Sequence, residues 1–180
     1  EIFAASLGDS GFMVLRRSLE DRRAKFSIVA RSSEQLHYWN FPYQLSRLPQ
    51  TLEVKVPEDA PRDSAESADS YHVVVHHGDL VLLFTDGFSD NVYDGEAVEV
   101  LSKLSVAAHD PGGSGEASWE SAAEIDPAAI AAELVDLAWK KSCSRSSECP
   151  FADRAHQSDH RRLGGKEDDI TVVAAWVHQS

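Results

Sequence analysis

The segment Leu83-Phe84-Thr85-Asp86-Gly87-Phe88-Ser89-Asp90-Asn91 sets an acidic turn directly after an apolar run, and much of the architecture can be argued from it. The run that leads into it, residues 79–85, is aliphatic on both faces, which predicts a strand in the middle of a sheet. An aspartate at the end of such a strand has its backbone held by the sheet while its short side chain projects into the rim. Asp86 is therefore a candidate ligand for a cation bound through oxygen atoms.

Two further acidic positions lie where a predicted strand meets a turn. Asp9 lies within Gly8-Asp9-Ser10-Gly11, and Asp168 and Asp169 come just before the last apolar run. Mg²⁺ and Mn²⁺ prefer carboxylate and water ligands, and converging carboxylates repel one another unless a cation lies among them. Taken singly, each position is as well explained by an ordinary turn. Only their combination favours a metal site.

The remaining apolar runs predict a mixed fold. We expect further strands at residues 2–7, 11–16, 25–30, 35–40, 71–76 and 170–177. Turn residues predict that the first two strands form a hairpin, and His77-Gly78 predicts a second hairpin between residues 71–76 and 79–85. Helical spacing of apolar residues predicts helices at 95–107 and at 127–141, the second beginning with Pro127. Strands and helices without regular βαβ alternation indicate an α+β fold with antiparallel sheets.

Three segments lack the apolar residues needed to build a core. Residues 48–70 and 110–126 are rich in Gly, Pro, Ser and acidic residues. Residues 142–166 are polar and irregular, apart from a short apolar island at residues 150–152. We expect all three segments to be exposed loops.

Composition limits the classes of function. The chain has 180 residues, 42% of them hydrophobic, which suits one domain with a sizeable core. Its formal net charge of −13 argues against nucleic acids or anionic membranes as partners. No apolar run approaches the roughly 20 residues that span a bilayer, so we expect a soluble protein without membrane insertion. Cys143 and Cys149 are too few for a disulfide framework or a thiolate zinc site, and free thiols are expected.

Three motifs in order resemble the type 2C, metal-dependent protein serine/threonine phosphatases, the PPM family. They are Leu7-Gly8-Asp9-Ser10-Gly11, the segment around Asp86 quoted above, and Gly165-Lys166-Glu167-Asp168-Asp169-Ile170-Thr171-Val172. Residues 34–45 and Cys149-Pro150-Phe151-Ala152 are similar to the mitochondrial-type branch of that family. The resemblance covers nearly the whole chain apart from the acidic loops. It implies that residues 1–180 form the C-terminal larger part of a single phosphatase domain.

The resemblance implies a four-layer α-β-β-α sandwich of two antiparallel sheets flanked by helices, present here in part, with metals at one edge. Asp86 and Asp168 match the family's ligands to a binuclear Mg²⁺ or Mn²⁺ centre, and Asp9 matches an aspartate associated with a third, weaker metal site. Gly87 and Asp90 match the support around Asp86. No side chain is assigned a catalytic role, because the attacking group is a metal-activated water. The family's bridging Asp-Gly pair has no counterpart in these residues.

Two functions from different classes remain open. The first is hydrolysis of phosphoserine and phosphothreonine in phosphoprotein substrates, with a mitochondrial location implied by the branch. The alternative is a non-catalytic, phosphatase-like binding or scaffold domain that lacks the bridging metal ligand. Because Asp86 and Asp168 are both present, we favour the enzyme for the parent protein. We expect little or no activity, and marginal stability, from the 180 residues in isolation.

Overall fold

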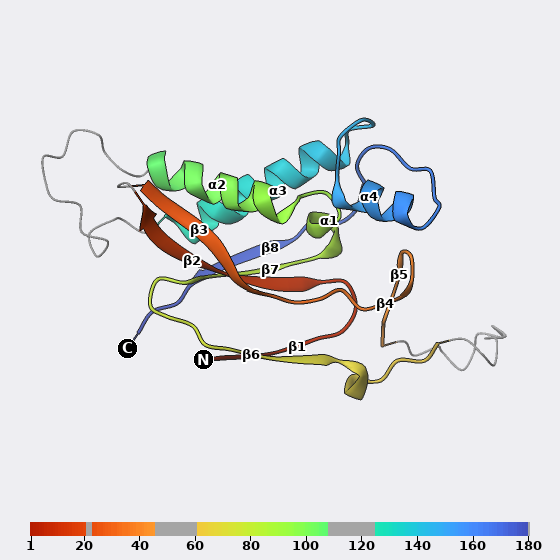
Figure 1. Cartoon of the computed structure of the whole chain (residues 1–180), viewed down its shortest axis with the longest axis horizontal. Coiled ribbons are helices and arrows are strands. Elements are labelled where there is room, and N and C mark those ends of the chain that lie inside the picture. The colour runs from red at the N-terminus through yellow and green to blue at the C-terminus, as the bar shows by residue number, and fades with distance from the viewer. Residues whose placement is uncertain (21–22, 46–60, 108–124, 180) are drawn as a thin grey trace, which may run out of the picture.

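The computed structural model describes residues 1–20, 23–45, 61–107 and 125–179. The strands are β1 (Ile2–Ser6), β2 (Gly11–Glu20), β3 (Arg23–Arg31), β4 (Leu36–Tyr38), β5 (Phe41–Pro42), β6 (Asp69–Val73), β7 (Leu80–Phe84) and β8 (Val172–Trp176). The helices are α1 (Asp86–Ser89), α2 (Asp94–Ala107), α3 (Pro127–Ser142) and α4 (Pro150–Gln157), and η1 (Ala65–Ser67) is a short 3-10 turn. Figure 1 shows their arrangement.

The principal sheet has four antiparallel strands in the order β3-β2-β7-β8. β7 lies between β2 and β8, so the central strand predicted from the aliphatic run at residues 79–85 is confirmed. Leu80, Leu82 and Phe84 point into the core from this strand. Hydrogen bonds on both edges hold β7 in place, which fixes the position of the acidic turn that follows it.

Both hairpins predicted from turn composition are wrong. β1 pairs with β6 in a separate two-stranded sheet, whereas β2 pairs with β3 and β7. The turn around Asp9 therefore carries the chain from one sheet to the other, and the segment between β6 and β7 carries it back. Turn residues indicate where a chain reverses, but the partner of each strand is selected by the apolar face that it buries. Gly8 adopts a positive φ of 95° in this crossing.

Helices α2 and α3 cover one face of the principal sheet (Figure 1), and both predicted helices are confirmed. Asp126 caps α3 by accepting a hydrogen bond from Ala128 N at 3.0 Å, and Pro127 occupies its first turn. The core between helices and sheet contains Met13, Leu15, Leu80, Leu82, Leu101, Ile130, Leu134 and Ala138. Burial of each large aliphatic side chain contributes about 1.5–3 kcal/mol, so this layer holds the sheet rigid.

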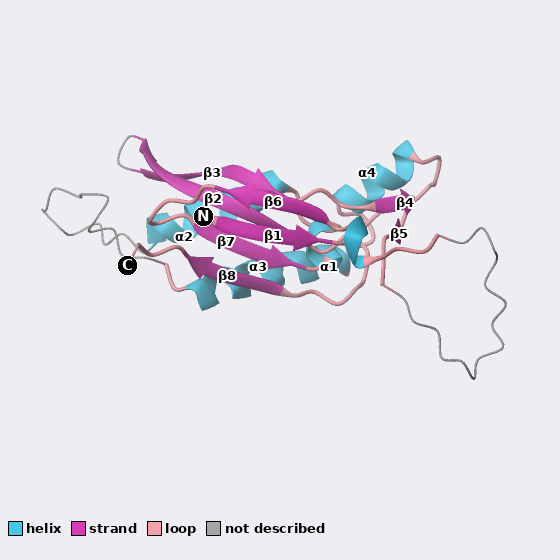
Figure 2. Cartoon of the chain, turned by 90° about the horizontal axis from the view of Figure 1, so that it is seen from below, coloured by secondary structure: helices cyan, strands magenta, loops and turns pink. Residues whose placement is uncertain are grey.

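The β1-β6 sheet lies against the other face of the principal sheet, as Figure 2 shows from below. The α+β class with antiparallel sheets flanked by helices is confirmed, and the described residues supply three of the four expected layers, because none of the described α-helices lies outside β1 and β6, where only the short 3-10 turn η1 is drawn. Leu83 and Val173, each 50% exposed, line a cavity of about 400 Å³ beside β1. None of the described helices is both long and apolar enough to cross a bilayer.

The expected irregular loop at residues 142–166 is wrong in its centre, where α4 forms. Pro150 starts this helix, and Phe151, Ala152 and Ala155 are buried on one side of it. The apolar island at residues 150–152 was thus the first turn of an amphipathic helix. Residues 46–60 and 108–124 lie outside the described residues, so most of the other two predicted loops does too.

Both cysteines are free thiols, as expected.

Candidate metal centre

The acidic turn after β7 forms a single helical turn, α1, that presents two carboxylates together. Asp86 begins α1, and Asp90 follows its last residue. Positions four residues apart lie on the same face of a helix, and Asp90 N donates to Asp86 O at 2.7 Å. Asp86 is half-buried and Asp90 is buried. The two side chains therefore share one side of a rigid turn at the end of the central strand.

The segment that precedes β8 brings the third carboxylate to this turn. Thr85 Oγ1 donates to Asp169 O at 2.9 Å and accepts from Thr171 N at 3.0 Å. A Cβ on Gly87 would lie 2.5 Å from Asp169 O, so only glycine allows this close approach. The space beside Gly87 is filled by this carbonyl group. Asp168 is thereby held next to Asp86.

Asp86, Asp90 and Asp168 form a cluster in which one oxygen of each lies within 4.8 Å of the others. We call these three residues the carboxylate cluster. Lys166 Nζ lies among them, at 2.7 Å from Asp86 Oδ2, 2.7 Å from Asp90 Oδ2 and 2.9 Å from Asp168 Oδ2. The three carboxylates supply only oxygen donors, which a hard divalent cation prefers. The ammonium group among them marks a space that a cation can occupy. The cluster therefore fits Mg²⁺ or Mn²⁺.

Lys166 and burial act in opposite directions on the pKa values of Asp90 and Asp168. The hydrogen bond from Lys166 lowers the pKa of Asp168. For Asp90, burial raises the pKa and outweighs the opposing hydrogen bond and charge of Lys166. For Lys166 itself, burial would lower the pKa, but hydrogen bonds to all three carboxylates reverse the direction and raise it. Lys166 is thus held firmly in its charged form.

Asp9 lies beside the carboxylate cluster and is not one of its members. It occupies the crossing between β1 and β2 and lines a pocket of about 10 Å³ that Asp90 also lines. Burial raises its pKa, the charge of Asp86 raises it further, and the charge of Lys166 opposes this. These interactions place Asp9 within electrostatic reach of the cluster.

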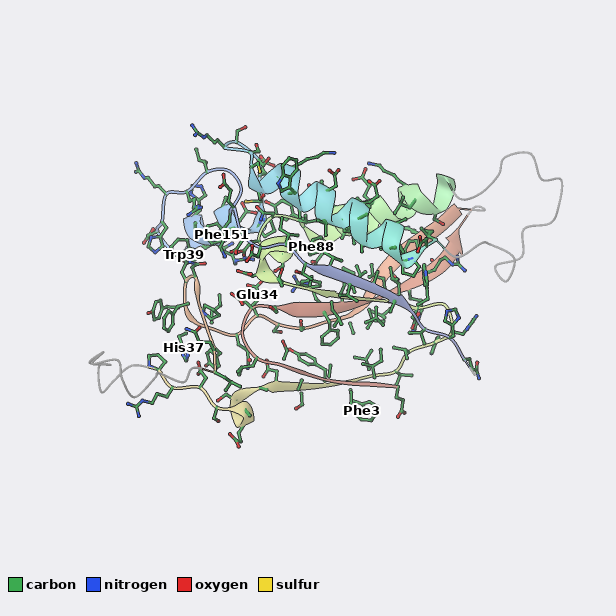
Figure 3. All side chains as sticks on the ribbon, turned by 180° about the vertical axis from the view of Figure 1, so that it is seen from behind. Phe3, Glu34, His37, Trp39, Phe88 and Phe151 are labelled. Atoms are coloured by element: carbon green, nitrogen blue, oxygen red, sulfur yellow. The ribbon has the colours of Figure 1, made fainter. Side chains whose placement is uncertain are left out.

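An arginine from α4 supports the cluster from outside. Arg154 donates a hydrogen bond to Asp90 and lies 3.5 Å from Glu34, on the segment between β3 and β4. Burial raises the pKa of Glu34, and the charge of Arg154 offsets this only in part. Helix α4 is anchored by Phe151, whose ring lies 5.4 Å from that of Trp39, and Figure 3 shows these two side chains next to each other. The helix missed in the sequence therefore contributes directly to this site.

The structure brings together Asp86 and Asp168, the two ligands expected from the sequence, and places Asp9 nearby. Asp90 was expected only to support Asp86, but it contributes the third carboxylate. Its spacing of four residues from Asp86 was a usable signal. Lys166 lies within the third motif, and the sequence alone assigns it no role. Nothing in the sequence linked Arg154 to Asp90, because α4 was not predicted.

Several known proteins of similar sequence are named protein phosphatases. "Protein phosphatase PTC7 homolog fig" of Drosophila grimshawi is 39% identical over 181 residues, which cover 99% of this chain and 50% of that protein. "Protein phosphatase PTC7 homolog" of Homo sapiens is 35% identical over 176 residues, covering 98% and 49%. "Probable protein phosphatase 2C 55" of Arabidopsis thaliana is 31% identical over 179 residues, covering 99% and 31%. The chain thus spans half or less of each of these relatives.

A solved structure that is similar to this chain is also that of a phosphatase. The X-ray structure of the photosystem II phosphatase PBCP matches 97% of this chain and 58% of its own, with a TM-score of 0.68 and 27% sequence identity. No family model matches the chain.

Proposed function

This chain belongs to the type 2C protein phosphatase family, in the branch of the PTC7 proteins, and we propose that its protein hydrolyses phosphoserine and phosphothreonine in phosphoproteins with the help of divalent metal ions. The proposal extends to the whole protein what the names of its relatives say of them. Residues 1–180 would then be the C-terminal larger part of one phosphatase domain. A mitochondrial location is part of the same proposal, and imaging the tagged full-length protein tests it.

The carboxylate cluster is the observation that carries this proposal. In it, Asp86, Asp90 and Asp168 converge within 4.8 Å at one end of the central strand. We assign Asp86 and Asp168 to hold Mg²⁺ or Mn²⁺, with Asp9 at a third, weaker site. When bound, a pair of such ions lowers the pKa of a water molecule and offsets charge on the phosphoryl oxygens.

The chain's own residues hold the site in shape for this chemistry. Asp86 and Asp90 are fixed by one helical turn, and Asp168 by the hydrogen bonds of its neighbours to Thr85. Arg154 holds Asp90 from the outer side. The carboxylates are therefore preorganised by hydrogen bonds outside the cluster, as a metal site requires.

The direct test is phosphate release from a phosphothreonine peptide by the full-length protein, with Mn²⁺, with Mg²⁺ and with EDTA. We expect hydrolysis with a divalent metal and none with EDTA. A full-length protein that binds Mn²⁺ but releases no phosphate from phosphoserine or phosphothreonine peptides would favour the scaffold function instead.

A further inference from the structure

Lys166 occupies the position that a cation bound by the carboxylate cluster would need. Its ammonium nitrogen contacts one oxygen of each carboxylate at 2.7 to 2.9 Å. A Mg²⁺ ion bound through these oxygens, at the usual Mg–O distance of about 2.1 Å, would need the space that this nitrogen fills. A divalent cation and an ammonium group placed together among these oxygens would also repel each other strongly. Metal and ammonium therefore exclude each other at this position.

The backbone of Lys166 is fixed, while its side chain can leave. Asn91 holds the backbone by accepting from Lys166 N and donating to Lys166 O, both at 2.9 Å. The ammonium also lies 5.3 Å from the centre of the Phe151 ring. Its four-carbon stem can move the ammonium out by rotation about single bonds, without moving the segment that carries Asp168.

Charge balance gives this lysine a role in the absence of metal. The three carboxylates lie close together, with Asp9 next to them, and would repel one another if left alone. Arg154 contacts only Asp90 among the three, whereas Lys166 contacts all of them. Removal of this ammonium would leave the cluster with a strong excess of negative charge.

We propose that Lys166 is a tethered competitor of the metal: its ammonium holds the carboxylate cluster together when no metal is bound and moves out when a metal enters. The inference rests on the proposed function, because it assumes that the cluster takes a divalent metal. It predicts that the lysine stabilises the metal-free protein and weakens metal binding. The same side chain thus lowers metal affinity while keeping the ligands assembled.

The test compares Lys166→Met with Lys141→Met in the full-length protein. Lys141 is a matched control because it is 13% exposed against 16% for Lys166, pairs with Glu96 at 2.6 Å, and lies 4.9 Å from the Tyr93 ring. Mn²⁺ affinity is measured by calorimetric titration, and the midpoint of thermal unfolding is measured in EDTA. We expect both variants to unfold at a lower temperature in EDTA. Only Lys166→Met should bind Mn²⁺ more tightly, by about tenfold for each 1.4 kcal/mol of competition removed.

Lys166→Arg serves as a second variant that keeps the charge. It should restore the unfolding midpoint in EDTA and keep the Mn²⁺ affinity near that of the unsubstituted protein. Unchanged or weaker Mn²⁺ binding by Lys166→Met overturns the inference and leaves the proposed function intact. Failure of the unsubstituted protein and of all variants to bind Mn²⁺ would overturn both, so the two failures are distinguishable.

Discussion

The side-chain amide of Asn91 exchanges two hydrogen bonds of 2.9 Å with the backbone of Lys166, a residue 75 positions further along the chain. The same amide nitrogen donates to Gly87 O at 2.9 Å. Asn91 is completely buried, and it fastens the segment before β8 to the helical turn that holds Asp86. An uncharged residue therefore sets the relative positions of the charged ones.

Asn91→Ala is expected to lower the free energy of unfolding by about 2–4 kcal/mol, because it leaves buried backbone groups without partners. Urea denaturation of the metal-free protein measures the change. The control is Ser33→Ala at an exposed position after β3, for which a change within about 0.5 kcal/mol is expected. Equal effects of the two substitutions would contradict the role given to Asn91.

Gly87→Ala and Gly95→Ala should have opposite effects. A Cβ at position 87 would lie 2.5 Å from Asp169 O, whereas one at position 95 would meet no atom within 4 Å. We expect Gly87→Ala to lower the free energy of unfolding by about 1–3 kcal/mol through overpacking and to weaken Mn²⁺ binding by displacing Asp168. Gly95→Ala, within α2, should raise the free energy of unfolding by about 0.5–1 kcal/mol. Chemical denaturation and calorimetric titration measure the two quantities.

Asp86→Asn should abolish Mn²⁺-dependent phosphatase activity in the full-length protein and leave the fold intact. The reason is that an amide is a much weaker ligand for a hard cation than a carboxylate. Asp94→Asn makes the same chemical change outside the cluster, where Asp94 pairs with Arg31 at 3.0 Å, and should retain activity. Phosphate release and circular dichroism spectra are compared for both. Full activity of Asp86→Asn would remove this residue from the metal site.

Asp79 gives a prediction for pH dependence at the opposite end of β7. Burial would raise its pKa, but hydrogen bonds from Arg16 and from His76 N outweigh it and hold the pKa below its usual value of 3.8. A carboxyl with a lowered pKa in the folded state stabilises the protein above the unfolded-state value, and this stabilisation disappears as the pH falls through the folded-state value.

Asp79→Asn should accordingly lower the free energy of unfolding by about 2–3 kcal/mol at neutral pH, because a charged pair of hydrogen bonds is lost. The difference from the unsubstituted protein should shrink as the pH falls below 3.8. Urea denaturation from pH 3 to pH 7 gives the profile. Glu99→Gln breaks an exposed pair with Lys103 and should give a profile close to that of the unsubstituted protein. A difference that grows in acid would refute the pKa direction.

The spacing of apolar residues predicted those elements whose structure depends mainly on neighbouring residues in the chain. The central strand and the two long helices followed from apolar spacing, and the placement of Asp86 after β7 followed from the end of that strand. The pairing of β1 with β6 did not follow, because it depends on which surfaces the whole chain can bury. Asp168 was found through a motif, whereas Arg154 reaches Asp90 only through α4, whose short apolar signal was missed. Long-range neighbours of this kind depend on tertiary packing, which periodicity does not report.

The order of β2, β7 and β8 in the principal sheet has a consequence for biosynthesis. One neighbour of β7 is β2, which lies early in the chain. Its other neighbour, β8, is the last of the described strands to leave the ribosome. Asp168 and Lys166 emerge just before β8, so Asp86 and Asp90 have neither their third carboxylate nor its lysine until translation has passed residue 168. At roughly 5–20 residues per second, several seconds separate the two halves of the cluster. The nascent chain therefore cannot assemble this cation site until its central strand can gain its second partner.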